Sequence, residues 1–162
     1  MNMKNLNYLF IGGGFLAGIV ITILVAYNSA PGMMLKEAES KYGFEQSVEV
    51  FEQTVLANGW KIPKVHDMRQ TMETFGKHGV KNMKVFELCH PTHAYEILSR
   101  DDERIVSSLM PCRVSIYEKS DGKTYVSWMN TSLMGNMMGG VIADVMGIAS
   151  AESLQMISSI KK

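Results

Sequence analysis

The chain has 162 residues, of which 46% are hydrophobic and 20% are charged, and 16 basic residues balance 16 acidic ones. This composition excludes a disordered or low-complexity chain. The zero net charge argues against a protein that binds nucleic acid through general basicity, so we expect no nucleic-acid partner. Two cysteines are too few for a disulfide-stabilised miniature protein. The sequence carries no nucleotide-binding or hydrolase motif and no paired acid and base, so it points to no enzyme and requires no cofactor.

An uncharged stretch near the start of the chain predicts a membrane anchor. It contains a largely apolar segment of 20 residues, Tyr8 to Tyr27. As a helix this segment spans about 30 Å, the thickness of the hydrocarbon core of a bilayer. It is too long for the apolar region of a cleaved signal peptide. We therefore predict a transmembrane anchor over residues 6–27 and a linker over residues 28–32.

The orientation of this anchor follows from the short segment that precedes it. Lysine and arginine counts on the two sides of the helix are nearly even and decide little. Because the N-terminal tail is very short, we expect the N-terminus in the cytoplasm and the following domain on the extracytoplasmic side. In a Gram-negative bacterium that side is the periplasm.

Helices and strands alternate irregularly through the next 70 residues. Phe44, Val48, Phe51 and Val55 recur at helical spacing and predict a helix that ends near Asn58-Gly59. The remaining patterns predict strands over 33–40, 60–66 and 84–88, and helices over 68–75 and 91–99. Pro63 favours an edge strand or a bulge, and Pro91 suits the first position of a helix.

The end of the chain combines a hairpin with helical periodicity. Two alternating runs around Asp121-Gly122 predict a β-hairpin. Apolar residues from Leu133 to Ile160 fall at helical spacing, although four glycines weaken that helix. We expect residues 33–133 to form an α+β domain, a two-layer sandwich with a mostly antiparallel sheet and helices on one side. Residues 134–162 are then a C-terminal amphipathic helical extension.

The segment from Glu87 to Asn130 resembles the family known as domain of unknown function 302. The resemblance rests on these residues: Cys89, Pro91, Pro111-Cys112-Arg113, Tyr117-Glu118 and Asp121-Gly122-Lys123. The chain departs from the family pattern at His90, where the family usually has Asn. The resemblance extends over about residues 33–133. It implies a small two-layer α+β fold that often self-associates, and it implies no reaction, substrate or cofactor.

Cys89, His90, His93 and Cys112 are the densest group of reactive side chains in the sequence. One interpretation is a redox pair of Cys89 and Cys112, which requires the end of one strand to lie beside the start of the next. Strand parity opposes it, because Cys89 should face away from Cys112 unless its strand has ended. A second interpretation is a zinc or copper site built from all four residues. In the third, both cysteines are buried, His90 caps a helix and His93 is solvated.

Arg113 lies near Tyr117 on the outer face of the predicted hairpin. An arginine beside aromatic rings binds anions or covers a partner subunit, so Arg113, His90 and Tyr117 are candidate ligand-binding residues. The leading hypothesis is a membrane-anchored extracytoplasmic module, not an enzyme, that binds a partner or ligand or forms a homo-oligomer such as a dimer. The alternative is a thiol-redox or metal-handling protein that uses Cys89 and Cys112.

Overall fold

The computed structural model describes the backbone of residues 3–162 and the side chains of residues 14–162. The chain divides into two compact units, an N-terminal helix and a domain over Met34–Lys162. The elements in chain order are α1 (Met3–Met34), β1 (Leu35–Glu39), α2 (Phe44–Ala57), β2 (Lys61–Asp67), α3 (Met68–Thr74), β3 (Met83–Cys89), α4 (Pro91–Leu98), the 3-10 helix η1 (Asp101–Leu109), β4 (Cys112–Glu118), β5 (Thr124–Met129), α5 (Thr131–Met138) and α6 (Gly140–Ser158).

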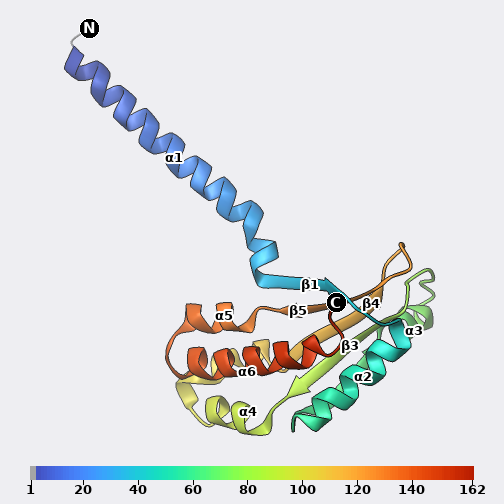
Figure 1. Cartoon of the computed structure of the whole chain (residues 1–162). Helices are drawn as coiled ribbons and strands as arrows, with labels where there is room; N and C mark the ends of the chain where they lie inside the picture. Colours follow the sequence, from blue (N-terminus) through green and yellow to red (C-terminus); the bar gives the residue numbers. More distant parts are fainter. Residues whose placement is uncertain (1–2) are drawn as a thin grey trace. The chain divides into compact units, whose positions relative to one another are not determined.

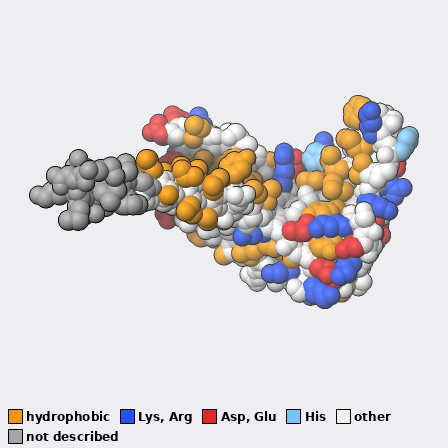
Figure 2. Space-filling model, turned by 90° about the horizontal axis from the view of Figure 1, so that it is seen from above, with side chains coloured by type: hydrophobic (Ala, Val, Ile, Leu, Met, Phe, Trp, Pro, Cys, Tyr) orange, Lys and Arg blue, Asp and Glu red, His pale blue; other side chains and the backbone are white. Residues whose placement is uncertain are grey.

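Two helices in the described part of the chain are long and apolar enough to cross a bilayer. One is the Gly14–Met34 part of α1, none of which is buried, and the other is α6, which is 39% buried. The described part of α1 presents a nearly continuous hydrophobic surface in Figure 2, whereas charged side chains of both signs are interspersed on the visible face of the domain. Residues 6–13 of the predicted anchor lie outside the described side chains.

The predicted linker over residues 28–32 is wrong, because these residues continue α1 as a helix to Met34, with Pro31 inside it. The side chain of Asn28 donates a hydrogen bond to the Leu24 carbonyl (2.8 Å) one turn earlier, instead of starting a turn. Glycine and proline are tolerated in apolar helices of this kind, so turn-forming composition alone does not end the helix.

The domain is built on a single five-stranded sheet in the order β1-β5-β4-β3-β2, and every neighbouring pair is antiparallel. This confirms the α+β class. The predicted hairpin joins β4 and β5, with Ile116 opposite Val126. β2 is an edge strand whose register shifts between Lys61 and Lys64, as Pro63 between them predicts. The sheet thus has two edges, β1 and β2.

Helices cover one face of this sheet and create the core with it (Figure 1). Phe86, Val114 and Val126 point from the central strands into the same cluster as Phe51 of α2 and Met156 of α6. All five are at most 2% exposed. The helical spacing of apolar residues in α2 therefore matches the face that the helix buries.

The C-terminal segment differs from the prediction in two ways. It forms two helices instead of one, because Gly139 and Gly140 adopt positive φ angles of 74° and 55° and reverse the chain between α5 and α6. It is also part of the domain and not an extension of it. Met156, Ile157 and Ile160 belong to the main core, each at most 1% exposed. A helix that supplies core residues cannot be removed without opening that core.

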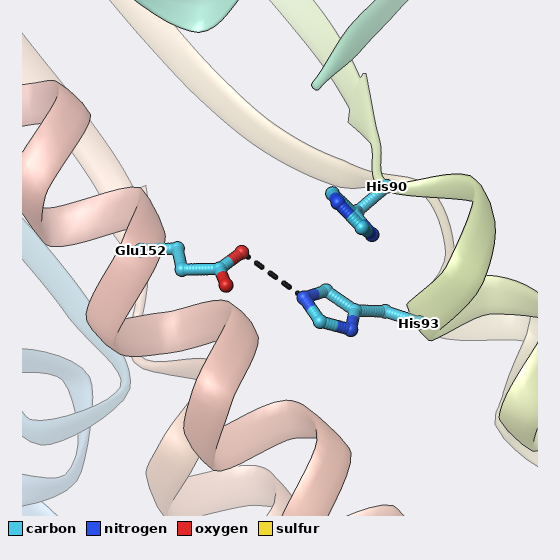
Figure 3. A group of neighbouring side chains, drawn as sticks. All are labelled: His90, His93 and Glu152. Atoms are coloured by element: carbon cyan, nitrogen blue, oxygen red, sulfur yellow. Dashed lines mark hydrogen bonds and ion pairs between the residues drawn. The ribbon is translucent and has the colours of Figure 1, made fainter. Parts of the chain in front are cut away.

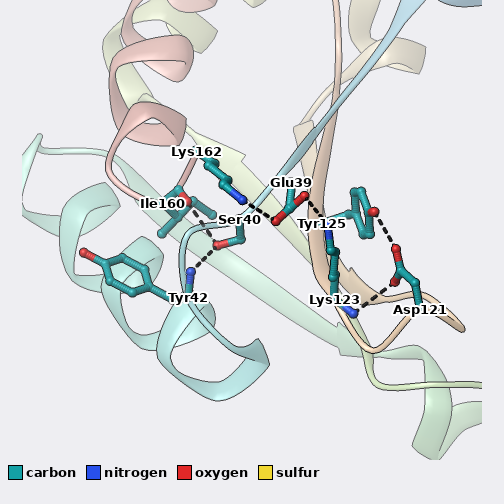
Figure 4. A network of polar contacts seen from close by, with 8 residues as sticks. All are labelled: Glu39, Ser40, Tyr42, Asp121, Lys123, Tyr125, Ile160 and Lys162. Atoms are coloured by element: carbon teal, nitrogen blue, oxygen red, sulfur yellow. Dashed lines mark hydrogen bonds and ion pairs between the residues drawn. The ribbon is translucent and has the colours of Figure 1, made fainter.

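The last residues of the chain form hydrogen bonds and an ion pair with the end of the first strand of the domain (Figure 4). The backbone N–H of Lys162 donates to the Glu39 carbonyl (3.0 Å), and its ammonium group donates to the Glu39 carboxylate (2.9 Å). The Ser40 hydroxyl donates to the Ile160 carbonyl (3.0 Å). On the other side of Glu39, Lys123 forms a second ion pair at 2.9 Å. The start and the end of the domain are thereby held together.

Candidate functional site

A cavity of about 450 Å³ lies where β3 and β4 meet the helices. Its apolar wall comes from α4, η1 and α6, and includes Ile97, Leu109, Val145 and Met146. Polar side chains enter it mainly from the junction of β3 and α4. The size and the mostly apolar lining are typical of pockets that hold a small organic molecule.

The junction of β3 and α4 positions three of the residues that the sequence singled out. β3 ends at Cys89, His90 is the N-cap of α4, and Pro91 opens the helix. Proline fits there because the first N–H groups of a helix have no partner within it. His93 follows at the next helical turn, so both imidazoles come from the same end of α4. Cys89, His90 and His93 all line the cavity.

The two cysteines are neighbours across the sheet. β3 and β4 are antiparallel, and Cys112 stands opposite Leu88, next to Cys89. Both thiols are free, and both residues line the same cavity even though strand parity predicts opposite faces. Cys89 is the last residue of β3, where the strict alternation of the strand ends. Burial raises the pKa of the Cys112 thiol, and the nearby Cys89 raises it further, so Cys112 is a poor source of thiolate.

His90 and His93 meet a carboxylate from α6, Glu152 (Figure 3). Nε2 of His93 lies 3.0 Å from Oε2 of Glu152. The indole N–H of Trp60 donates to the same carboxylate oxygen at 2.9 Å. Burial raises the pKa of Glu152, but the hydrogen bonds from His93 and Trp60 outweigh it and hold that pKa below its ordinary value. His93 is therefore paired with a carboxylate and not merely solvated.

The two imidazole rings lie against each other and against Trp60. The ring centroids of His90 and His93 are 4.1 Å apart, and the Trp60 ring meets both rings edge-on at 5.6 and 6.0 Å. Nδ1 of His90 is buried and has no hydrogen-bond partner among the described residues. As expected His90 occupies the N-cap of α4, but its side chain makes no capping hydrogen bond. The side chain is therefore available for another role.

Arg113 and Tyr117 lie away from this cluster. They alternate along β4 with the buried residues Val114 and Ile116, so they occupy the opposite face of the sheet. Arg113 pairs with Glu87 at 3.5 Å, and the Tyr117 hydroxyl donates to Glu37. The structure does not bring these two residues to the His90 cluster. Their role in anion binding or at a dimer surface stays a prediction.

The sequence reasoning missed Glu152 and Trp60. Glu152 is one of only two acidic residues in α6, whose other residues are uncharged. Trp60 is 2% exposed, and its indole N–H is satisfied by this carboxylate. A carboxylate in a largely apolar helix and a tryptophan after a helix stop are the sequence signals that could have found them. Glu152 follows His93 by 59 positions and Trp60 by 92 positions, and periodicity cannot reveal contacts over such separations.

Comparison with known proteins confirms the resemblance found in the sequence. The sequence model of the family described as Domain of unknown function DUF302 matches residues 36–160. The chain is also similar to the crystal structure of an uncharacterised conserved DUF302 protein from Bacillus stearothermophilus, with a TM-score of 0.70 and 15% identity. That similarity covers 80% of this chain and 99% of the other, and at this identity it shows the fold alone. No match was found among curated proteins.

Proposed function

This chain belongs to the family described as Domain of unknown function DUF302, and we propose that it is a membrane-anchored extracytoplasmic module that binds a small, largely apolar ligand. The observation that carries the proposal is the cavity of about 450 Å³, with its apolar wall and its cluster of polar groups at one side. Burying the apolar part of a ligand supplies affinity, at roughly 25 cal/mol per Å². The few polar groups fix its orientation.

The polar side of the cavity indicates what the ligand carries at one end. His90, His93 and the two thiols converge there, and neutral imidazoles both donate and accept hydrogen bonds. The unpartnered Nδ1 of His90 favours a ligand with a hydroxyl or another group that can hydrogen-bond it. A planar aromatic alcohol fits both the apolar wall and this polar end.

The test uses 2-naphthol as the probe and the full chain in lipid nanodiscs. Saturation-transfer NMR should show contact between the probe and the chain. Ala94 lines the cavity from α4, so Ala94→Trp should fill it and abolish the signal. Ala57→Trp, on an exposed position near the end of α2, is the matched control and should retain it. Equal signals from both variants, or no signal from the unaltered chain, would overturn the proposal.

The extracytoplasmic placement is tested separately. The apolar length of α1 supports the anchor, and its orientation is part of the proposal. A phosphatase that is active only outside the cytoplasm should be active when it is fused after Lys162 through a flexible spacer. A fluorescent protein that matures only in the cytoplasm is the matched control. Fluorescence from the second fusion, together with no phosphatase activity from the first, would mean that the domain lies in the cytoplasm.

A thiol-redox role is the second candidate, and the register of the sheet supports it. The antiparallel pairing of β3 and β4 brings Cys89 beside Cys112, as a redox pair requires. The raised pKa of Cys112 opposes rapid exchange. The intact mass of the full chain, isolated from an oxidising compartment without reductant, separates the two candidates. A loss of about 2 Da would place the redox role first, because forming a disulfide removes two hydrogens.

A further inference from the structure

The cluster of His90, His93 and Glu152 brings together more donor atoms than a single hydrogen bond to an organic ligand requires. We infer that these three residues form a binding site for a divalent transition-metal ion, with Zn²⁺ as the preferred occupant, that connects α4 to α6 at the wall of the cavity. This inference does not depend on an organic ligand in the cavity, because it concerns the metal ion alone. It replaces the four-residue metal site predicted from the sequence with a different set of ligands.

The donor atoms match what zinc binds. Two imidazoles and a carboxylate are a known zinc ligand set that leaves a fourth position open for water or substrate. One candidate donor atom from each of the three residues lies within 4.8 Å of the other two. Among the described residues, these three form the one group of histidines, cysteines or carboxylates whose donor atoms lie this close together.

The separations fit the coordination geometry. Zinc bonds of about 2.0–2.2 Å in a tetrahedron place neighbouring ligand atoms about 3.3 Å apart. Nε2 of His93 and Oε2 of Glu152 are already 3.0 Å apart. The remaining pairs need to close by about 1.5 Å at most, which side-chain rotation of His90 provides.

Trp60 holds the Glu152 carboxylate in place. Its indole N–H donates to Glu152 at 2.9 Å, and its ring contacts both imidazole rings. The side chain is 2% exposed and belongs to the main core, so its position is fixed by packing. Residues that hydrogen-bond a metal ligand orient it, and their loss typically weakens metal affinity tenfold to a hundredfold. Trp60 has this role in the inferred site.

His90 provides the observation that points to a ligand. Its Nδ1 is buried and has no partner among the described residues, and burying a polar group without a hydrogen bond is unfavourable. The adjacent His93 ring lies with its centroid 4.1 Å away. A metal ion, or a water molecule bound to it, accounts for two imidazoles held together and for the unsatisfied nitrogen. A purely structural His93–Glu152 pair needs no second histidine.

The test is calorimetric titration of Zn²⁺ into the full chain, in detergent and without a histidine tag, after metals have been removed with a chelator. We expect one Zn²⁺ per chain. His90→Ala and Glu152→Gln should each weaken binding at least tenfold, and Trp60→Phe should weaken it about tenfold. His78→Ala and Glu49→Gln, at exposed positions outside the cluster, are the matched controls and should bind as the unaltered chain does. Far-ultraviolet circular dichroism and the thermal unfolding midpoint confirm that each variant is folded.

Three results would overturn the inference. The first is no saturable binding of Zn²⁺ to the unaltered chain. The second is a loss of affinity in the control variants equal to the loss in His90→Ala and Glu152→Gln. The third is full binding in a folded His90→Ala, Glu152→Gln double variant together with loss of binding in Cys89→Ser, Cys112→Ser. That last outcome would assign the metal to the thiols.

Discussion

Gly135 allows α5 and α6 to approach each other more closely than any larger residue would. A Cβ atom added there would lie 2.8 Å from Cβ of Met146 and 3.3 Å from two backbone atoms of α6. Carbon atoms prefer about 3.5–4.0 Å. Because two of the three contacts are with backbone, relief requires α6 itself to move away from α5.

The expected effect of Gly135→Ala combines two opposing terms. Replacing glycine by alanine inside a helix gains about 1 kcal/mol. Overpacking costs about 1–3 kcal/mol, and contacts with backbone favour the upper end of that range. We therefore expect the variant to lower the free energy of unfolding by about 1–2 kcal/mol. Gly147, within α6, is the matched control because an added Cβ there meets nothing within 4 Å. Gly147→Ala should raise the free energy of unfolding by about 0.5–1 kcal/mol.

The assay is thermal unfolding of the full chain in detergent, followed by tryptophan fluorescence. Both tryptophans of the sequence, Trp60 and Trp128, are in the domain, so the signal is independent of α1. For a domain of this size about 1 kcal/mol corresponds to about 3–6 °C in Tm. The two variants should therefore shift Tm in opposite directions. A Gly135→Ala variant as stable as Gly147→Ala would refute the close packing of α5 on α6.

Three further predictions concern single side chains. The pKa of Glu37 is lowered by its hydrogen bond to Lys119, so its contribution to stability is fully present above about pH 4.5 and is lost as the pH falls through the lower folded-state pKa. Glu37→Gln should therefore flatten the acid side of a curve of the free energy of unfolding against pH. A curve that this substitution leaves unchanged would contradict the prediction. Asp67 accepts a hydrogen bond from the Gln70 N–H at 2.8 Å and caps α3, so in chemical unfolding Asp67→Ala should cost about 1 kcal/mol, whereas Asp67→Asn should cost little. Because burial raises the pKa of Cys112, its alkylation by iodoacetamide at pH 8 should be much slower in the folded chain than after unfolding. The rate is followed by intact mass in a Cys89→Ser variant, where Cys112 is the remaining thiol, and equal rates would show that this thiol is exposed.

Sequence patterns predicted the local elements well because local periodicity specifies them. The helix over Phe44–Ala57 and the β4–β5 hairpin depend on neighbours within a few residues. The break between α5 and α6 depends on the positive φ angles of Gly139 and Gly140, and in a sequence these glycines look like weak points of one helix. The predicted linker was wrong because turn-forming residues after an apolar segment can continue its helix.

Only about half of the candidate site could be predicted from the sequence. The junction of Cys89, His90 and Pro91 is readable in the sequence because a strand end meets a helix start there. Glu152 and Trp60 are not, since they reach the histidines only when α6 and the turn between α2 and β2 lie beside the start of α4. Periodicity assigns residues to faces, but only the tertiary fold decides which faces meet.

The fastening of Lys162 and Ile160 onto β1 has a consequence for the order of folding during synthesis. The first strand of the domain pairs with the last strand, and the Ser40 to Ile160 hydrogen bond joins residues 120 positions apart. Such distant contacts form only after the whole segment between them is available. The main core therefore closes only after Met156, Ile157 and Ile160 have left the ribosome. In the proposed extracytoplasmic topology, a domain whose core closes this late would still be open while it crosses the membrane.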